Sequence, residues 1–312
     1  MSPDPVSPDS ASPDSASGRP RPSAEAAPSL ASVVRTGEAA LRAAGVVSAG
    51  TDAVALAAHA LGCSDAEVRR RMVLGRRIDH DALTVFEDLV ARRRDRIPLQ
   101  HLTGTVAFRR LELRVGPGVF VPRPETEVVA QAAIDEAAAC GHGAVVVDLC
   151  AGSAAIALAV GDEAPDAHVV AVEVDPMAAA WAAANIEATG LAVELVVADA
   201  TTALPGREGT VDVVVSNPPY IPVGMVPVDP EVRDHDPGTA LYGGSSDGLH
   251  IPLAVAARAA DLLAPGGLLV MEHADTQGET LPERLRRTGR WEQVEDHPDL
   301  SGRPRYVTAR RR

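Results

Sequence analysis

Short apolar runs alternate with longer helical segments from about residue 123 to the end of this 312-residue chain. Between the runs, helical spacing of apolar residues follows residue 150 and recurs over about 177–188 and 250–263. Parallel strands need crossover connections of this kind, so the alternation predicts a parallel sheet with helices on both faces. Ligands of such sheets bind at the carboxyl ends of the strands, near the point where the strand order reverses. The predicted strands are 145–149, 169–174, 195–198, 211–216 and 268–272.

The residues before this alternation predict three further segments. Over 1–29, Ser-Pro-Asp recurs with almost nothing apolar, a composition typical of a disordered tail. Over 30–97, apolar residues recur at helical spacing, which predicts a small all-helical domain. Over 98–122, apolar and polar residues alternate between glycines, which predicts a β-hairpin. We expect this hairpin to link the helical domain to an α/β domain at 123–312.

Local signals in the helical domain predict helix starts and solvated faces. Thr51-Asp52 and Ser64-Asp65 are candidate N-caps, because their side chains can accept hydrogen bonds from the free amides of a first turn. Arginine clusters at 69–71 and 92–94 are more typical of solvated helix faces than of partner contacts.

The charge distribution limits the kinds of partner. All 29 basic residues are arginine, the formal net charge is −14, and residues 116–312 carry −16 against +4 over 31–115. Nucleic-acid binding neutralises phosphates with basic side chains, so this balance argues against a stable nucleic-acid complex. Cys63, Cys140 and Cys150 have no paired spacing, so neither a disulfide framework nor a metal site is predicted. With no secretory signal and no apolar run of about 18 residues, we expect a cytoplasmic protein outside the membrane.

Acidic residues follow three successive predicted strands, as in sites that bind a nucleoside. The turn at 148–154 would let the backbone approach a ligand closely, although Gly152 is its one glycine; an alanine at 154 is tolerated where φ is negative. Glu173 can accept hydrogen bonds from both ribose hydroxyls, and Asp199 can meet an adenine edge. No GxxxxGK[ST] loop is present, which argues against an NTPase. The predicted cofactor residues are Asp148, Cys150, Ala151, Gly152, Ser153, Ala154, Glu173, Asp199, Ala200 and Asn217.

The fourth predicted strand runs into Asn217, Pro218, Pro219 and Tyr220, and this loop favours S-adenosylmethionine as the cofactor. Two prolines stiffen the loop, so its carbonyl oxygens and the Asn217 side-chain oxygen point in fixed directions. Such acceptors can hold both hydrogens of a planar NH2 group in line with a sulfonium methyl, and can stabilise the charge that develops on nitrogen. Tyr220 can stack its ring on a planar acceptor. Asn217, Pro218 and Tyr220 are therefore the predicted catalytic residues, although the loop alone specifies only an NH2 group on something flat.

Together these motifs resemble the HemK/PrmC family, the peptide chain release factor N5-glutamine methyltransferases. The resemblance covers about residues 30–312. It implies a Rossmann-like class I S-adenosylmethionine-dependent methyltransferase fold, and it implies that the acceptor is the glutamine in the Gly-Gly-Gln motif of release factors. The matching segments are 98–104, 121–127, 148–157 and 216–221, followed by 231–233, 237, 240–241, 243–244, 247–248, 266–267 and 272–273.

The resemblance also implies roles for single residues. Residues 150–154 should border the methionine part of the cofactor, Glu173 should bind its ribose, and Asn217 should lie between cofactor and substrate. The helical domain is expected to recognise the release factor, and the protein is expected to be a monomer. The implied substrate residues are Asn217, Pro218, Pro219 and Tyr220, with Arg123 and Glu125 bracing the wall of the site.

Two other functions remain open at this point. One is methylation of the adenine N6 amino group in DNA or RNA, which would need base flipping and a basic channel that the acidic balance does not favour. The other is an inactive methyltransferase fold that serves as a binding module, motivated by the glycine-poor turn. A further hypothesis concerns the acidic residues after the catalytic loop, which are candidates for a partner-facing rim: Asp229, Glu231, Asp234 and Asp236.

Overall fold

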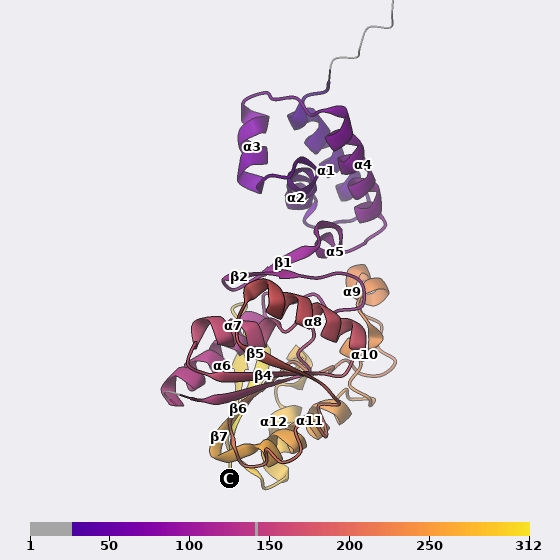
Figure 1. The fold of residues 1–312 in the computed structure, drawn as a ribbon. Helices are drawn as coiled ribbons and strands as arrows, with labels where there is room; N and C mark the ends of the chain where they lie inside the picture. Colours follow the sequence, from indigo (N-terminus) through magenta and orange to yellow (C-terminus); the bar gives the residue numbers. More distant parts are fainter. Residues whose placement is uncertain (1–26, 141–142) are drawn as a thin grey trace, which may run out of the picture.

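The computed structural model describes residues 27–140 and 143–312. The Ser-Pro-Asp repeats of the predicted tail lie outside the described residues. Figure 1 shows a helical part that is joined through a two-stranded hairpin to a larger α/β part. No helix of the described ranges combines the length and the apolar character that crossing a bilayer would require.

Five helices build the helical part. Leu41, Leu56 and Phe86 belong to its buried core, to which α1, α2 and α4 contribute. The predicted cap at Ser64 is confirmed, since its side chain accepts from the Glu67 amide, but the cap at Thr51-Asp52 is wrong. Asp52 lies inside a helix that begins three residues earlier, and it is buried. The helices are α1 (Leu30–Ala43), α2 (Ala49–Leu61), α3 (Asp65–Val73), α4 (His80–Arg94) and α5 (Leu99–Thr103).

The hairpin is shorter than predicted. Its strands, β1 (Thr105–Phe108) and β2 (Leu111–Arg114), pair antiparallel, whereas the first part of the predicted hairpin forms α5. Leu99 and Leu102 pack against the core of the helical part, so this segment is stabilised by packing on helices and not by pairing with a strand. Gly104 then ends α5 at φ +79°, a left-handed conformation that glycine adopts without strain.

The α/β part is built on a seven-stranded sheet in the order β5-β4-β3-β6-β7-β9-β8. The first five of these strands are parallel and confirm the predicted ones, with β3 and β6 at the predicted bounds. The last two strands pair antiparallel and were not predicted. The strands are β3 (Val145–Leu149), β4 (His168–Glu173), β5 (Val193–Val197), β6 (Val211–Ser216), β7 (Leu263–Glu272), β8 (Trp291–Pro298) and β9 (Pro304–Arg311).

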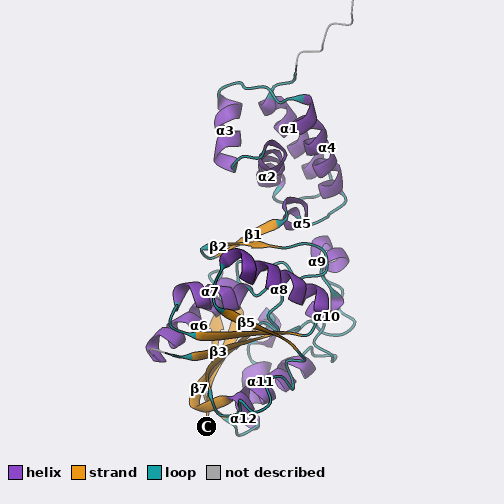
Figure 2. Cartoon of the chain, viewed as in Figure 1, coloured by secondary structure: helices purple, strands orange, loops and turns teal. Residues whose placement is uncertain are grey.

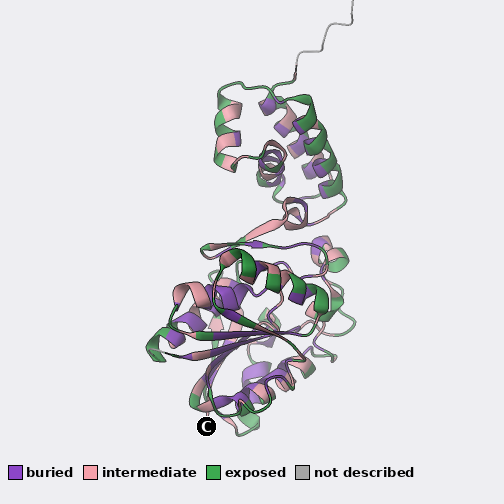
Figure 3. Cartoon of the chain, viewed as in Figure 1, coloured by how far each residue is buried: buried purple, intermediate pink, exposed green. Residues whose placement is uncertain are grey.

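Helices cover both faces of the sheet, as predicted, and the strands between them are buried (Figures 2 and 3). On one face lie α6 (Thr126–Cys140), α7 (Ala155–Glu163) and α8 (Pro176–Thr189). On the other lie α11 (His250–Leu262) and α12 (Thr280–Arg287). The strand order reverses between β3 and β6, so the ends of these two strands flank the expected ligand site. Shorter segments complete the fold: α9 (Pro230–His235), α10 (Gly238–Leu241) and the 3-10 helix η1 (Asp275–Gln277).

Candidate active site

A cavity of about 700 Å³ opens at the carboxyl ends of the parallel strands. Its walls include the residues that follow β3, β4, β5 and β6, which is where the sequence placed the cofactor and the catalytic loop. The volume lies within the range of small-molecule and cofactor sites, roughly 300–1,000 Å³. The predicted site residues that line it are Arg123, Cys150, Ala151, Gly152, Ser153, Glu173, Asp199, Ala200, Asn217, Pro219 and Tyr220.

Four predicted site residues do not line this cavity: Glu125, Asp148, Ala154 and Pro218. Glu125 is exposed, and Pro218 is buried. Asp148 is 1% exposed, and its Oδ2 accepts from the Ala157 amide at 3.0 Å. Burial raises the pKa of Asp148 to about 8. Asp148 thus holds the start of α7 against the end of β3, and its contribution to the site is indirect.

The turn after β3 adopts a left-handed backbone at three positions. Cys150 has φ +67°, Gly152 +56° and Ala154 +64°, so Ala154 does not have the negative φ at which an alanine is readily tolerated. A left-handed residue other than glycine costs about 1–2 kcal/mol. The surroundings hold the turn in place, since Ala154 is fully buried and the Ser153 carbonyl accepts from Asn185 Nδ2 at 3.1 Å. Burial raises the pKa of the Cys150 thiol, which stays neutral.

The acidic residues of the cavity fit a cofactor that is cationic and carries no phosphate. Glu173 accepts from the amides of Gly152 and Asp175, each at 2.8 Å, and its oxygens keep further lone pairs for ribose hydroxyls. Asp199 accepts from the amide and the hydroxyl of Thr201 through Oδ1, so its Oδ2 is not used in these bonds. Among the residues that line the cavity, Arg123 is the arginine, and it forms an ion pair with the buried carboxylate of Asp236.

Two side chains hold the catalytic loop from opposite ends. Asn217 donates through Nδ2 to Thr126 Oγ1 at 3.4 Å, and within the described residues nothing donates to its Oδ1. Tyr220 donates through its hydroxyl to Glu272 Oε1 at 3.1 Å. The loop therefore presents an amide oxygen as a free acceptor beside the cofactor residues. The sequence alone predicts no role for Glu272, although residue 272 is among the matches to the family.

Glycines press against the back of the same loop. A Cβ at Gly248 would lie 2.1 Å from the carbonyl oxygen of Tyr220, and one at Gly243 would lie 1.9 Å from the carbonyl oxygen of Gly248. Gln277 Nε2 donates to the same Tyr220 oxygen at 3.0 Å. The family matches at 243–244 and 247–248 thus have a physical cause in the close packing of backbone behind Tyr220.

Gly248→Ala is expected to lower turnover by about tenfold or more, because its Cβ would displace the Tyr220 carbonyl and misplace the loop. The control is Gly206→Ala. Gly206 also has positive φ (+87°), but a Cβ there meets nothing within 4 Å, so this variant isolates the backbone strain of about 1–2 kcal/mol. Turnover and urea denaturation of both variants check the prediction. Equal turnover in the two variants would show that the close approach does not matter.

Glu272 is a buried acid whose protonation should be visible in stability. Burial raises its pKa from the ordinary 4.5 to about 7, although hydrogen bonds from Thr126 and Tyr220 and the charge of Arg305 lower it, while Glu125 raises it. The folded protein therefore keeps a proton on Glu272 over a pH range in which the unfolded chain has lost it.

Relative to Glu272→Gln, the wild-type protein is expected to lose stability as the pH rises from 4.5 to about 7. The unfolded state binds fewer protons than the folded state in this window, so the free energy of unfolding falls with pH. Above the window the difference between the two proteins should be constant. Urea denaturation across these pH values measures it, and two parallel profiles would contradict the assignment.

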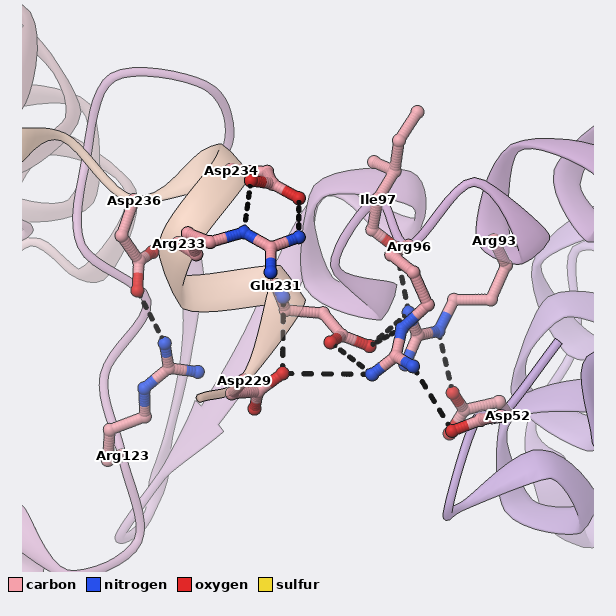
Figure 4. Close-up of polar contacts among 11 residues, drawn as sticks. Asp52, Arg93, Arg96, Ile97, Arg123, Asp229, Glu231, Arg233, Asp234 and Asp236 are labelled. Atoms are coloured by element: carbon pink, nitrogen blue, oxygen red, sulfur yellow. Dashed lines mark hydrogen bonds and ion pairs between the residues drawn. The ribbon is translucent and has the colours of Figure 1, made fainter. Parts of the chain in front are cut away.

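The proposed acidic rim is partly wrong. Glu231 and Asp236 are buried, and they accept from Arg93 and Arg123 of the same chain (Figure 4). Asp234 remains exposed beside Arg233. The two buried carboxylates are thus unavailable to a partner, because the chain itself supplies their counter-charges.

Comparison with known proteins agrees with this arrangement. The model of the PrmC N-terminal domain matches residues 32–104, and that of the methyltransferase small domain matches 113–225. A release factor glutamine methyltransferase from Mycolicibacterium smegmatis is 47% identical over 284 residues, which are 90% of this chain and 98% of that protein. A 4-amino-L-phenylalanine/4-methylamino-L-phenylalanine methyltransferase from Streptomyces pristinaespiralis is 41% identical over 217 residues, 68% of this chain and 73% of that protein.

Among solved structures, the hMettl16 catalytic domain in complex with the MAT2A 3'UTR hairpin 6 superposes with a TM-score of 0.51. It is 17% identical and covers 72% of this chain and 82% of that chain, so the likeness concerns the fold alone. The predicted class I methyltransferase fold is confirmed by the sheet order and by the domain match. Near-complete coverage of a relative at 47% identity shows the family, and this chain belongs to the release factor glutamine methyltransferases.

Proposed function

We propose that this protein transfers a methyl group from S-adenosylmethionine to the side-chain amide nitrogen (N5) of the glutamine in the Gly-Gly-Gln motif of peptide chain release factors. The observation that carries the proposal is the Asn217 amide. Its nitrogen donates to Thr126, which leaves its oxygen as an acceptor, and Asn217 lines the same cavity as Glu173 and Gly152. An oxygen acceptor beside a cofactor site is what an NH2 group requires.

S-adenosylmethionine would supply an electrophilic methyl on a sulfonium, which is cationic. Glu173 would accept from its ribose, and the acids around the cavity suit its positive charge. The glutamine nitrogen would form the new N–C bond as the S–C bond breaks, which would leave a neutral thioether, and the proton lost from nitrogen would pass to water.

A glutamine amide is a weak nucleophile because its lone pair is delocalised into the carbonyl. Asn217 Oδ1 and the carbonyls of the proline-stiffened loop would accept its two hydrogens and orient it. These acceptors would also stabilise the positive charge that develops on nitrogen during transfer. Tyr220, whose hydroxyl is tied to Glu272, would present its ring to the flat amide.

The helical domain is proposed to recognise the release factor, and the protein to act as a cytoplasmic monomer without stable nucleic-acid binding. The match to the PrmC N-terminal domain and the name of the relative that shares nearly the full length support a release factor as the partner.

The test is incubation of the purified protein with labelled S-adenosylmethionine and a full-length release factor, followed by mass mapping of the Gly-Gly-Gln peptide. One added methyl on the glutamine is expected. Duplex DNA, RNA and 4-amino-L-phenylalanine serve as competing acceptors, since each carries a planar NH2 group. Label in one of these and none in the release factor would overturn the proposal. Cofactor binding without any turnover would instead favour a binding module.

A further inference from the structure

A buried ion network joins the helical domain to α9, the short helix that follows the catalytic loop (Figure 4). Arg93 of α4 donates through Nε to Asp52 Oδ2 at 2.8 Å and through Nη1 to Glu231 Oε1 at 2.6 Å. Asp52 and Arg93 are 2% and 5% exposed. The middle residue of the predicted solvated cluster 92–94 therefore points inward, where it bridges acids of two domains.

Arg96 is the second arginine that binds the Glu231 carboxylate. It donates through Nε to Glu231 Oε1 at 2.9 Å and also bonds Oε2, and its Nη1 donates to the Gly45 carbonyl at 3.1 Å. Its backbone is left-handed at φ +65°, which is costly for a residue other than glycine. Burial raises the pKa of Glu231, but hydrogen bonds led by that of Arg96 outweigh it and hold the pKa at about 2. The carboxylate is thus charged throughout the working pH range.

Val232 of α9 and residues beyond the helix, 237 and 239–242, form one wall of the cavity. Asp236, next after α9, accepts from Arg123 at 2.6 Å, and the Arg123 guanidinium lies 4.9 Å from the centre of the Phe120 ring. Val232, Arg123 and Phe120 all line the cavity. The wall is therefore held at two points: Glu231 pairs with the helical domain, and Asp236 pairs with Arg123 of the cavity lining.

Backbone hydrogen bonds tie this wall to the catalytic loop. The Ile221 amide donates to the Leu241 carbonyl at 2.8 Å, and the Gly243 amide donates to the Ile221 carbonyl at 2.9 Å. Residue 221 directly follows Tyr220, so a shift of the segment 230–241 would reach the loop that holds Asn217. A contiguous set of bonds thus runs from the helical domain to the site.

We propose that Glu231 is a positioning residue, through which the helical domain holds α9 and the cavity wall in the geometry that methyl transfer requires. The inference rests on the proposed function of the site. It gives the helical domain a role in turnover in addition to recognition of the release factor. Buried ion pairs add little net stability compared with apolar packing, but their directional bonds define a single arrangement of the parts that they join.

The test compares Glu231→Gln, which keeps the shape and removes the charge, with Glu136→Gln as a matched control. Glu136 also accepts two bonds from one arginine, Arg310, but this pair joins α6 to β9. Kinetics with a full-length release factor are measured at a temperature at which both variants are folded. For Glu231→Gln we expect kcat to fall by about tenfold or more, because small misplacements at a reacting centre are costly. The KM for the release factor should change much less, and Glu136→Gln should match the wild type.

Two outcomes would overturn the proposal. One is a wild-type kcat in folded Glu231→Gln, and the other is a loss confined to KM, which would mean that the network serves docking alone. If Glu231→Gln does not fold, Arg96→Gln replaces it, since Arg93 still pairs with Glu231 there, and the same split is expected. Failure of the proposed function is seen separately, as the absence of methylated Gly-Gly-Gln peptide with the wild-type protein.

Discussion

Replacement of Asn217 by alanine is expected to lower kcat for glutamine methylation by about 10²- to 10³-fold, the usual loss when one preorganised polar group at a reacting centre is removed. The Asn217 oxygen is the free acceptor of the site, because Thr126 holds the amide nitrogen. Without it, one hydrogen of the substrate NH2 group loses its partner, and the amide is neither oriented nor stabilised as charge develops. Single-turnover methylation of a full-length release factor measures the effect.

Cofactor binding provides the control for this variant. Glu173 and the turn at 150–154 are untouched by the substitution, so calorimetric titration with S-adenosylmethionine should give an affinity within a few fold of the wild type. Turnover above about a tenth of the wild-type value would place the amide acceptor elsewhere, and the loop carbonyls would then be the next candidates. A parallel loss of cofactor affinity would show that Asn217 acts on the cofactor more than on the acceptor.

Replacement of Arg93 by alanine is expected to lower the free energy of unfolding by about 3–5 kcal/mol, because it leaves two buried carboxylates without their shared partner. Asp52 would lose its ion pair outright, and Glu231 would keep the bonds from Arg96. Removal of one member of a buried pair costs more than the pair contributes, since the remaining charge has no water around it. Urea denaturation followed by circular dichroism measures the change.

The matched control is Arg92→Ala, one residue earlier in the same helix. Arg92 is half exposed and lies 3.8 Å from an exposed Asp88, so its removal should cost no more than about 1 kcal/mol. The two variants remove the same side chain from neighbouring positions and differ in burial. Similar losses in the free energy of unfolding of both variants would mean that the buried interdomain network contributes no more to stability than an exposed ion pair.

The sheet and the catalytic loop could be predicted because each is encoded in a few adjacent residues. The strand that contains Val213–Val215 is buried on both faces, so its run of valines has no reason to alternate with polar residues. The loop at 217–220 follows from its prolines and from its place after such a strand. The antiparallel edge could not be predicted in this way, because β8 exposes most of its side chains and carries no apolar run.

The turn at 150–154 shows a different limit. An alanine is readily tolerated at negative φ, yet Ala154 is left-handed and fully buried. The preference of one residue amounts to about 1–2 kcal/mol, and packing of a whole sheet and helix outweighs it. Local preference thus predicts backbone conformation only where the surroundings do not oppose it.

Periodicity and turn chemistry act between neighbours in the chain, and they were enough for the parallel strands, the helices on their faces and the loop around Asn217. Whether a charged residue is buried or exposed, and with which residue it pairs, was decided only by the tertiary structure. Arg93 and Glu231 are 138 residues apart, and each looks like a surface residue in its own segment. A charge becomes a buried positioning contact when distant segments bring it an opposite charge and exclude water, and that pairing is a property of the fold.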